Sequence, residues 1–335
     1  MTDVSEIIAK LDSGLRKRLT LGDAVSFETQ SLPSMGLTRA LNGGFPYGRQ
    51  VLIYGSKSSA KSSFCLQLVA DAQAEGKVCA WIDAEMSYDT SWAERMGVDT
   101  SQLIVSEART INDMVDVATQ LMKAGVDLIV VDSITSLLPA IYFEKKSEEL
   151  KALENTKQIG AESRDFSNAM KMLNYANNKT KPTLLVLISQ TRNNIGAMFT
   201  TQQPTGGQSV KFYSSIIIKL FSSESEGNAI TAKREVGNKL IEENVGRKVN
   251  WMVQFSKTSP AFVSGEYDFY FSGDRVGIDK EGETLDIAIK YGLIEVAGAW
   301  YKVGDESLQG RSKAIDYLRH NREVRNGLER QIASL

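Results

Sequence analysis

The chain has 335 residues, of which 42% are hydrophobic and 24% charged, the proportions of a folded globular protein long enough for about two domains. A single histidine, His320, and two cysteines, Cys65 and Cys79, nearly exclude Ser-His-Asp and Cys-His catalysis, histidine metal centres, zinc sites and disulfide frameworks. With 39 basic and 41 acidic residues the net charge is −2, so any contact with nucleic acid must come from local patches rather than from a globally basic surface.

The N-terminal residues predict an amphipathic helix rather than a secretory signal. Residues 1–18 are polar, without the apolar block of a signal peptide, and no apolar run in the chain approaches the roughly 20 residues that span a bilayer. We therefore expect a soluble cytoplasmic protein that makes no membrane contact. Residues 3–19 have a helical pattern that Asp3 and Glu6 can cap. Such a short helix either folds onto its own domain or docks on a neighbouring subunit.

Four apolar runs indicate buried strands. They cover residues 50–54, 78–82, 128–131 and 184–188, and the stretches between them can form helices. Buried strands alternating with helices predict a parallel sheet with right-handed crossovers, so residues 30–260 are expected to form an α/β domain. Residues 277–335 have shorter periodic segments and an Arg-rich terminal helix, which predicts a small α+β appendage.

A phosphate-binding loop follows the first of these strands. The P-loop formula requires Gly, four variable residues, and then Gly-Lys-Ser/Thr before a helix. The residues at these positions and around them are Gly55, Ser56, Lys57, Ser58, Ser59, Ala60, Lys61, Ser62 and Ser63. Backbone N–H groups would surround the phosphates, with Lys61 as their charge partner and the Ser62 hydroxyl on Mg²⁺. Ala60 replaces the second glycine, and we interpret it as a tolerated variant because alanine is accepted wherever φ stays negative.

Polar residues at the ends of the other three strands complete an ATPase set. Asp132 follows the strand at 128–131 and can order the metal, while Glu85 follows the strand at 78–82 and can orient a water molecule. Gln190 follows the third strand and can sense a γ-phosphate. The segment after Gln190 runs to Gly207 without a periodic pattern, which indicates a functional loop that is ordered by the nucleotide.

Together these motifs resemble the RecA family of homologous-recombination ATPases. The similarity covers about residues 30–320 and follows the family's order. It rests on residues 55–63, 81–85, 130–133, 190–199, 205–207 and 211–213, and on residues 293–295 and 297–301 near the C-terminus. The resemblance implies an α/β fold with three parts: a short helical docking segment at residues 1–32, a RecA-type P-loop ATPase core with a mainly parallel twisted sheet at 33–264, and a small α+β domain at 265–335.

The resemblance also implies an ATP- and Mg²⁺-dependent recombinase. Such proteins form helical filaments on single-stranded DNA, bind ATP between adjacent subunits, pair homologous double-stranded DNA, exchange strands in recombination and in repair of DNA damage, and work with single-strand-binding and mediator proteins. By position, Lys61, Glu85, Gln190 and Lys257 would be catalytic, with Lys257 acting on the ATP of a neighbouring subunit. Ser62 and Asp132 would hold the metal, Asp89 and Trp92 the adenine, and Phe212 would relay the ATP state between subunits.

Two loops match the DNA-binding loops of the family. In the first loop and the segment after it, Ile159, Arg164 and Lys171 match; in the second, the matching residues are Arg192, Asn194, Ile195, Phe199, Gly206, Gly207 and Gln208. Basic side chains and glycine N–H groups would bind phosphates, while an apolar wedge such as Ile195 accepts any base. We therefore expect sequence-independent binding of single-stranded DNA.

Departures from the bacterial pattern leave two alternatives open. With Ala60 in place of glycine, the P-loop resembles that of phage-encoded UvsX-type recombinases. Bacterial RecA has two lysines where this chain keeps only Lys257, which predicts slower or differently coupled hydrolysis. The first alternative is a hexameric helicase of the same fold, although the short N-terminal segment predicts against it. The second is a filament coat that binds ATP without hydrolysing it. Six basic residues against three acidic ones in the terminal helix could gather duplex DNA or form an ordinary solvated face.

Overall fold

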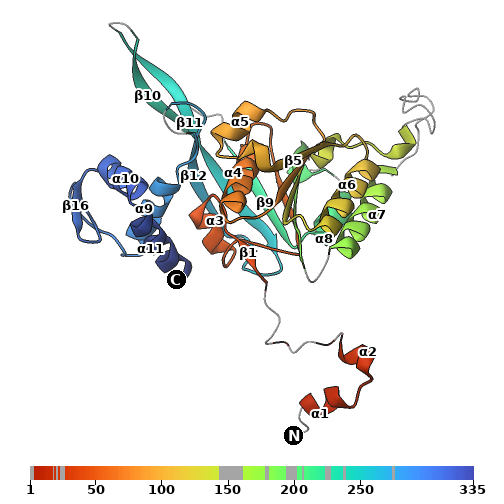
Figure 1. The fold of residues 1–335 in the computed structure, drawn as a ribbon. Helices are drawn as coiled ribbons and strands as arrows, with labels where there is room; N and C mark the ends of the chain where they lie inside the picture. Colours follow the sequence, from red (N-terminus) through yellow and green to blue (C-terminus); the bar gives the residue numbers. More distant parts are fainter. Residues whose placement is uncertain are drawn as a thin grey trace.

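The structure is a computed structural model that describes residues 4–17, 19, 22, 27–142, 161–177, 181–193, 202–205, 207–222, 228–236, 239–273 and 276–335. Its centre is a large twisted sheet with the strand order β13-β12-β11-β9-β3-β7-β6-β4-β5 (Figure 1). The bounds are β3 (Gln50–Gly55), β4 (Cys79–Asp83), β5 (Leu103–Glu107), β6 (Leu128–Asp132), β7 (Leu184–Asn193), β9 (Ile216–Phe221), β11 (Lys239–Ser256), β12 (Ser264–Tyr270) and β13 (Gly277–Ile278).

The strands from β9 to β5 pair in parallel, while β11, β12 and β13 add an antiparallel edge. This arrangement confirms the predicted α/β class with a mainly parallel sheet. All four predicted strands are present. The sequence interpretation did not include β5, an edge strand on which Ile104 and Val105 remain exposed, or β9, which lies between β3 and β11.

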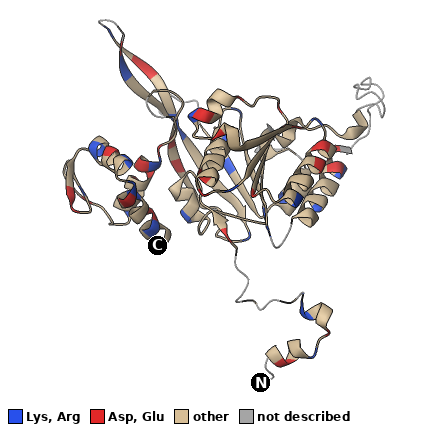
Figure 2. Ribbon diagram, viewed as in Figure 1, with Lys and Arg blue, Asp and Glu red and all other residues tan. Residues whose placement is uncertain are grey.

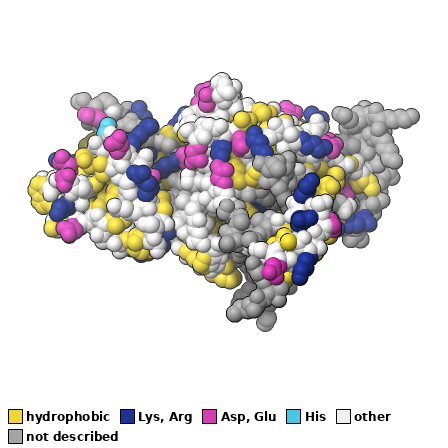
Figure 3. Space-filling model, turned by 60° about the horizontal axis from the view of Figure 1, so that its bottom comes forward, with side chains coloured by type: hydrophobic (Ala, Val, Ile, Leu, Met, Phe, Trp, Pro, Cys, Tyr) yellow, Lys and Arg dark blue, Asp and Glu magenta, His cyan; other side chains and the backbone are white. Residues whose placement is uncertain are grey.

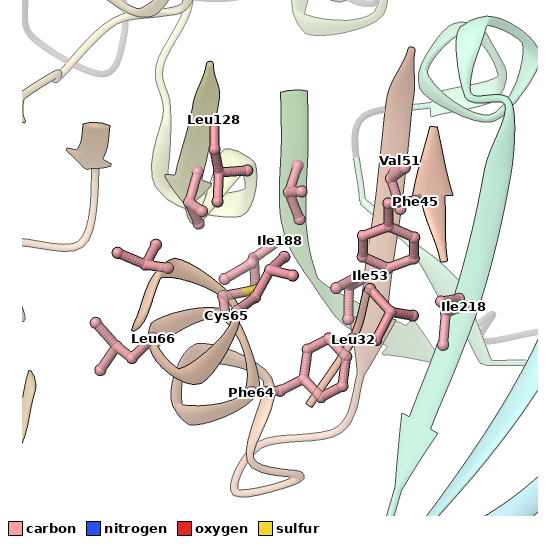
Figure 4. Close-up of a cluster of buried hydrophobic side chains, with 14 of the residues drawn as sticks. Leu32, Phe45, Val51, Ile53, Phe64, Cys65, Leu66, Leu128, Ile188 and Ile218 are labelled. Atoms are coloured by element: carbon pink, nitrogen blue, oxygen red, sulfur yellow. The ribbon is translucent and has the colours of Figure 1, made fainter. Parts of the chain in front are cut away.

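Helices cover both faces of the parallel strands. One face packs against α3 (Met35–Ala40), α4 (Lys61–Ala74) and α5 (Thr90–Arg95), and the other against α6 (Ile111–Ala124), α7 (Ala161–Ala176) and α8 (Gly207–Tyr213). In Figure 4, Ile53 lies toward Cys65 and Phe64 of α4, and Val51 lies beside Phe45. The alternate residues of β3, Leu52 and Tyr54, belong to the core cluster on the other face, with residues of α6 and α7. Because both faces are buried, these strands have continuous apolar sequences instead of alternating ones.

The expected single helix at residues 3–19 is wrong. The chain forms α1 (Val4–Ala9) and then α2 (Ser13–Arg16), whose N-cap Asp12 accepts a hydrogen bond from the backbone N–H of Leu15. Asp and Ser favour a helix cap over a helix interior, which explains the break. Neither helix buries a residue, and both lie away from the sheet in Figure 1. Asp3 of the expected cap lies outside the described residues.

A long two-stranded arm was not anticipated. β10 (Ala229–Val236) pairs antiparallel with the first part of β11, and the pair projects from the sheet in Figure 1. Acidic and basic residues both occur along it, as Figure 2 shows. Smaller elements are β1 (Thr29–Gln30), β2 (Phe45–Pro46), β8 (Gln202–Pro204) and the 3-10 helices η2 (Thr100–Gln102), η3 (Ile134–Ser136) and η4 (Ala140–Tyr142). Among the described helices, none is long and apolar enough to cross a membrane.

The C-terminal module has a core of its own. It comprises α9 (Lys280–Lys290), β14 (Glu295–Ala297), β15 (Trp300–Val303), β16 (Glu306–Gln309), α10 (Arg311–His320) and α11 (Arg322–Ala333). The single Arg-rich helix expected at the terminus is therefore two helices. Ion pairs connect Arg311, Arg319 and Arg325 to Asp286, Asp316 and Glu281, respectively. On the face that Figure 3 shows, basic and acidic side chains are interspersed over the module at the left.

The expected domain boundary after residue 264 falls at the start of β12. Because β12 pairs with β11 and β13 pairs with β12, residues up to Ile278 extend the large sheet. The module is attached through Glu283 of α9. The carboxylate of Glu283 accepts hydrogen bonds from the Ser34 hydroxyl (2.7 Å) and from the backbone N–H groups of Met35 (2.8 Å) and Gly36 (3.1 Å) at the start of α3.

We expect Glu283→Ala to lower the free energy of unfolding by about 2 kcal/mol, since three donors at a half-buried interface lose their acceptor. Asp286→Ala on the same helix is the matched control: it removes an exposed ion pair with Arg311, which contributes about 0–1 kcal/mol. Urea denaturation of both variants measures the difference. Equal losses would show that Glu283 does not join the two parts.

Candidate functional site

The P-loop connects β3 to α4 and folds around the side chain of Lys61. The Lys61 ammonium donates hydrogen bonds to the carbonyl oxygens of Gly55 (3.2 Å) and Ser56 (2.7 Å). Burial lowers the pKa of Lys61, while the negative charges of Asp132 and Glu85 oppose that shift. Gly55 is required by packing, because a Cβ at this position would lie 1.9 Å from the Leu220 carbonyl oxygen of β9. The loop is thus fixed against the sheet at its start.

The backbone of Ala60 differs from the expectation. Its φ is +60°, in the left-handed region, so our assumption that φ stays negative is wrong. Ser58 in the same loop has a φ of +61°. A residue with a Cβ in this region costs roughly 1–2 kcal/mol, which explains why the P-loop formula places glycine at the position of Ala60. The chain keeps the conformation of the loop in spite of the strain.

The carboxyl ends of β4, β6 and β7 bring the predicted polar residues together. Glu85 lies just beyond β4, and its Oε1 accepts hydrogen bonds from the Ser133 hydroxyl (2.6 Å) and from Nε2 of Gln190 (2.9 Å). The backbone N–H of Gln190 donates to the Thr135 hydroxyl (2.9 Å). The sequence predicted that Glu85 and Gln190 share this edge but assigned no role to Ser133 or Thr135. Their signal was two hydroxyl residues, one directly after Asp132 at the end of β6 and the other two positions later.

Asp132 is buried at the end of β6, with 4% of its surface exposed. Burial raises the pKa of Asp132 to about 6, although a hydrogen bond with the Ser62 side chain lowers it. The contact joins the two predicted metal-holding residues, Ser62 and Asp132. Asp83, at the end of β4, accepts hydrogen bonds from the backbone N–H groups of Ser87 and Tyr88, so this carboxylate shapes the turn that leads to α5.

The two residues expected at the adenine lie beside the P-loop helix. Asp89 is the N-cap of α5 and accepts a hydrogen bond from the backbone N–H of Trp92 (2.7 Å). The indole Nε1 of Trp92 donates to the Ser63 hydroxyl (3.2 Å) in the first turn of α4. The structure therefore brings Trp92 to the phosphate loop, with Asp89 fixing the start of its helix.

The predicted DNA-binding residues are partly described. Arg164 and Lys171 lie on α7, and Gly207 and Gln208 begin α8, on the same face of the sheet. The backbone of Arg192 belongs to the extension of β7 that pairs with β8. Ile159, Asn194, Ile195, Phe199 and Gly206 lie outside the described residues.

Phe212 and Lys257 are both exposed, and both lie next to residues 213–215, which lead into β9. Phe212 lies on α8 with 81% of its surface accessible. Lys257 follows β11, and its backbone N–H donates to the carbonyl of Ser215, just before β9 begins. Because β11 is antiparallel to β9, this places Lys257 at the edge of the sheet opposite to Glu85. Lys257 and Glu85 of one chain therefore do not share a site.

We expect Ala60→Gly to raise the free energy of unfolding by about 1 kcal/mol, because glycine adopts a positive φ without strain. Ala70→Gly, in the interior of α4, is the control of opposite sign and should lower it by about 1 kcal/mol. Chemical denaturation of the two variants gives both values. A destabilised Ala60→Gly protein would contradict the left-handed conformation.

The raised pKa of Asp132 gives a pH dependence. An acid whose pKa is about 6 in the folded chain and near 3.8 unfolded binds more protons when folded, so its contribution to stability falls as the pH rises from about 4 to 6. Asp132→Asn removes the buried charge, so it should stabilise the nucleotide-free protein by up to about 3 kcal/mol at pH 7.5. The gain should vanish near pH 4. Urea denaturation at both pH values measures it, and a gain independent of pH would contradict the assignment.

Comparisons with known proteins agree with this geometry. The family model "RecA N-terminal domain" matches residues 3–275, and "RecA C-terminal domain" matches residues 282–335. Proteins named "Protein RecA" are similar along most of the chain. The one from Rickettsia bellii is 33% identical over 313 residues, covering 92% of this chain and 84% of the relative. Those from Nocardioides sp. and Marinobacter nauticus are 34% and 35% identical, covering 94% and 90% of this chain and 85% and 82% of theirs. The chain therefore belongs to the RecA family of ATP-dependent DNA recombination and repair proteins.

Proposed function

We propose that the chain hydrolyses ATP with Mg²⁺ at the P-loop and couples this to filament formation and strand exchange on DNA. The observation that carries the proposal is the hydrogen bond between Glu85 and Gln190 at the strand edge that also carries the P-loop. It joins a candidate base for the attacking water to a candidate sensor of the γ-phosphate. An isolated phosphate-binding loop would not need this pair.

The residues present fit a magnesium–nucleotide complex. Lys61 is surrounded by loop carbonyls at the start of α4, where backbone N–H groups and the helix dipole favour phosphate. Ser62 and Asp132 supply the hard oxygen ligands that Mg²⁺ prefers, and they already contact each other. With its pKa near 6, Asp132 is ionised at neutral pH. Bound Mg²⁺ would neutralise phosphate charge.

In this proposal Glu85 accepts the proton of the attacking water. The Ser133 hydroxyl and the Gln190 amide hold Oε1 of Glu85 in place. A γ-phosphate oxygen would compete for the same Gln190 amide, so the Glu85–Gln190 bond would report whether ATP is intact. Gln190 lies in β7, and the chain continues from this strand through Arg192 toward the second predicted DNA loop. Hydrolysis and DNA binding are thereby coupled through one strand.

Self-association into a filament accounts for surfaces that the single chain leaves uncovered. α1 and α2 present Val4 (56% exposed), Ile7 (50%) and Leu15 (47%) without burying any residue. Phe212 is exposed on α8, and Lys257 lies on the opposite edge from its own Glu85. We propose that α1 and α2 dock on an adjacent copy and that Lys257 acts at that copy's nucleotide.

The DNA contacts remain those expected from the sequence. We propose that single-stranded DNA binds along Arg164, Lys171, Arg192, Gly207 and Gln208, and that duplex DNA and single-strand-binding or mediator proteins are further partners. The domain division that we propose keeps the docking segment at residues 1–32 and moves the start of the C-terminal module from residue 265 to 279. The pairing of β12 and β13 with the large sheet supports this change.

Glu85→Gln should lower the rate of ATP hydrolysis by about 10²–10⁴ while nucleotide binding is kept, because the amide preserves the shape but accepts no proton. The matched control is Glu107→Gln. Glu107 lies at the end of β5, the strand next to β4, and pairs there with Asp83 at the same edge of the sheet. This variant should hydrolyse ATP at the wild-type rate. Phosphate release with and without single-stranded DNA measures both.

Phosphate release, a duplex-unwinding assay and electron microscopy together separate the alternatives. A near-zero wild-type rate that DNA does not stimulate would favour the non-hydrolysing coat. Unwinding of a duplex without homology would favour the helicase, and electron micrographs with ATP and single-stranded DNA would then show closed rings. Helical filaments that persist in the Glu85→Gln variant are the result expected from the proposal.

A further inference from the structure

We infer that Arg247 is a positioning residue of the nucleotide site. It holds the P-loop in the conformation in which Ser58 and Ala60 have left-handed backbone angles. Arg247 lies on β11, where the arm joins the sheet, and pairs there with Ala229 of β10 and Phe269 of β12. From the sequence, no residue of β11 was assigned to the nucleotide site. The inference rests on the nucleotide role proposed above for the P-loop.

The guanidinium of Arg247 is fixed on two sides. Its Nη1 donates a hydrogen bond to the backbone carbonyl of Ser58 at 3.2 Å, and its Cζ lies 5.6 Å from the centroid of the Phe271 ring. A charged donor and a stacked aromatic face make this contact stronger than an ordinary surface hydrogen bond. Arg247 thus connects the rim of the large sheet to the outer turn of the P-loop.

The Ser58 carbonyl is the atom through which the loop can be held. Ser58 and Ala60 both have positive φ, an unfavourable conformation for residues with a Cβ, so the loop needs contacts that stabilise it. The direction of the Ser58 carbonyl depends on the backbone angles of Ser58. A bond to that carbonyl therefore favours the left-handed conformation over its alternatives. A loop with glycine at position 60 would depend less on it.

Further contacts continue from Phe271 to the other end of the loop. The carbonyl oxygen of Phe271 accepts a hydrogen bond from Nη2 of Arg95 (3.1 Å), and the Arg95 guanidinium lies 5.1 Å from the ring of Trp92. Trp92 in turn donates to Ser63. We call Arg247, Phe271, Arg95 and Trp92 the P-loop brace. It reaches the loop at Ser58 and at Ser63, before and after the strained Ala60.

The brace fixes the loop before the nucleotide arrives. Ordering a loop at the moment of binding weakens affinity, and a pre-formed loop avoids that loss. Because Arg247 acts on the loop and not on one particular phosphate, its effect should be equal for di- and triphosphates. This separates it from a residue that contacts the γ-phosphate.

The test compares dissociation constants for Mg-ADP and for a slowly hydrolysed Mg-ATP analogue by calorimetric titration. Arg247→Met keeps an apolar stem beside Phe271 but has no donor, and it should bind both nucleotides about tenfold more weakly. Adding Ala60→Gly to Arg247→Met should restore binding of both nucleotides to within about threefold of wild type, since glycine removes the strain that Arg247 offsets.

Two further variants control for folding and for charge. Lys248→Met alters the next residue of β11, whose side chain points to the other face and pairs with Glu266 and Asp268; it should bind nucleotide like the wild type. Arg247→Gln is the second variant if Arg247→Met has a lowered melting temperature, and it should show the same glycine rescue.

Arg247→Met binding within about twofold of wild type would overturn the inference, as would a loss that Ala60→Gly does not relieve. A larger loss for the triphosphate analogue than for Mg-ADP would also overturn it and assign Arg247 to the γ-phosphate. If the wild type itself binds neither nucleotide, the proposed function fails first. Tight wild-type binding with an unaffected Arg247→Met variant rejects only the role of Arg247.

Discussion

The chemistry of this protein depends on a parallel sheet that is buried on both faces. Because β3, β4, β6 and β7 run in the same direction and lie next to one another, their carboxyl ends form one edge, and residues far apart in the chain meet there. Glu85 and Gln190 are separated by 105 positions yet share a hydrogen bond of 2.9 Å. The helices on both faces exclude water from the strands, so the sheet is a rigid base on which the loops at that edge are held.

The same edge concentrates groups that are unfavourable for stability. Lys61 and Asp132 are both buried. Burial lowers the pKa of Lys61 and raises the pKa of Asp132, because it disfavours the charged form of each side chain. Their mutual attraction only partly offsets these shifts, because moving charges out of water is costly. The left-handed Ser58 and Ala60 add backbone strain at the same place. Energetically unfavourable features of this kind persist where the surrounding structure holds them in place.

Other features are consistent with the self-association proposed above. α1 and α2 bury none of their residues within their own chain, although they carry an apolar stripe. Phe212 and Lys257 are exposed near the start of β9. A helix that is apolar on one side gains stability when that side is covered, so a neighbouring copy would supply what the single chain lacks.

The sequence by itself determined the fold class, the P-loop and the residues at the carboxyl edge, because these follow from local patterns. Continuous apolar runs define buried parallel strands, and any polar residue directly after such a strand reaches the shared edge, which is why Glu85, Asp132 and Gln190 could be selected. Only the tertiary structure decided the sign of φ at Ala60, the partners of Glu85 at Ser133, the break between α1 and α2, the β10–β11 arm and the contact of Arg247 with Ser58. Backbone angles in a loop and contacts between distant segments depend on how the sheet closes around them. Local signals, such as Asp12 and Ser13 at the helix break or Ser133 after β6, permit these features but do not determine them.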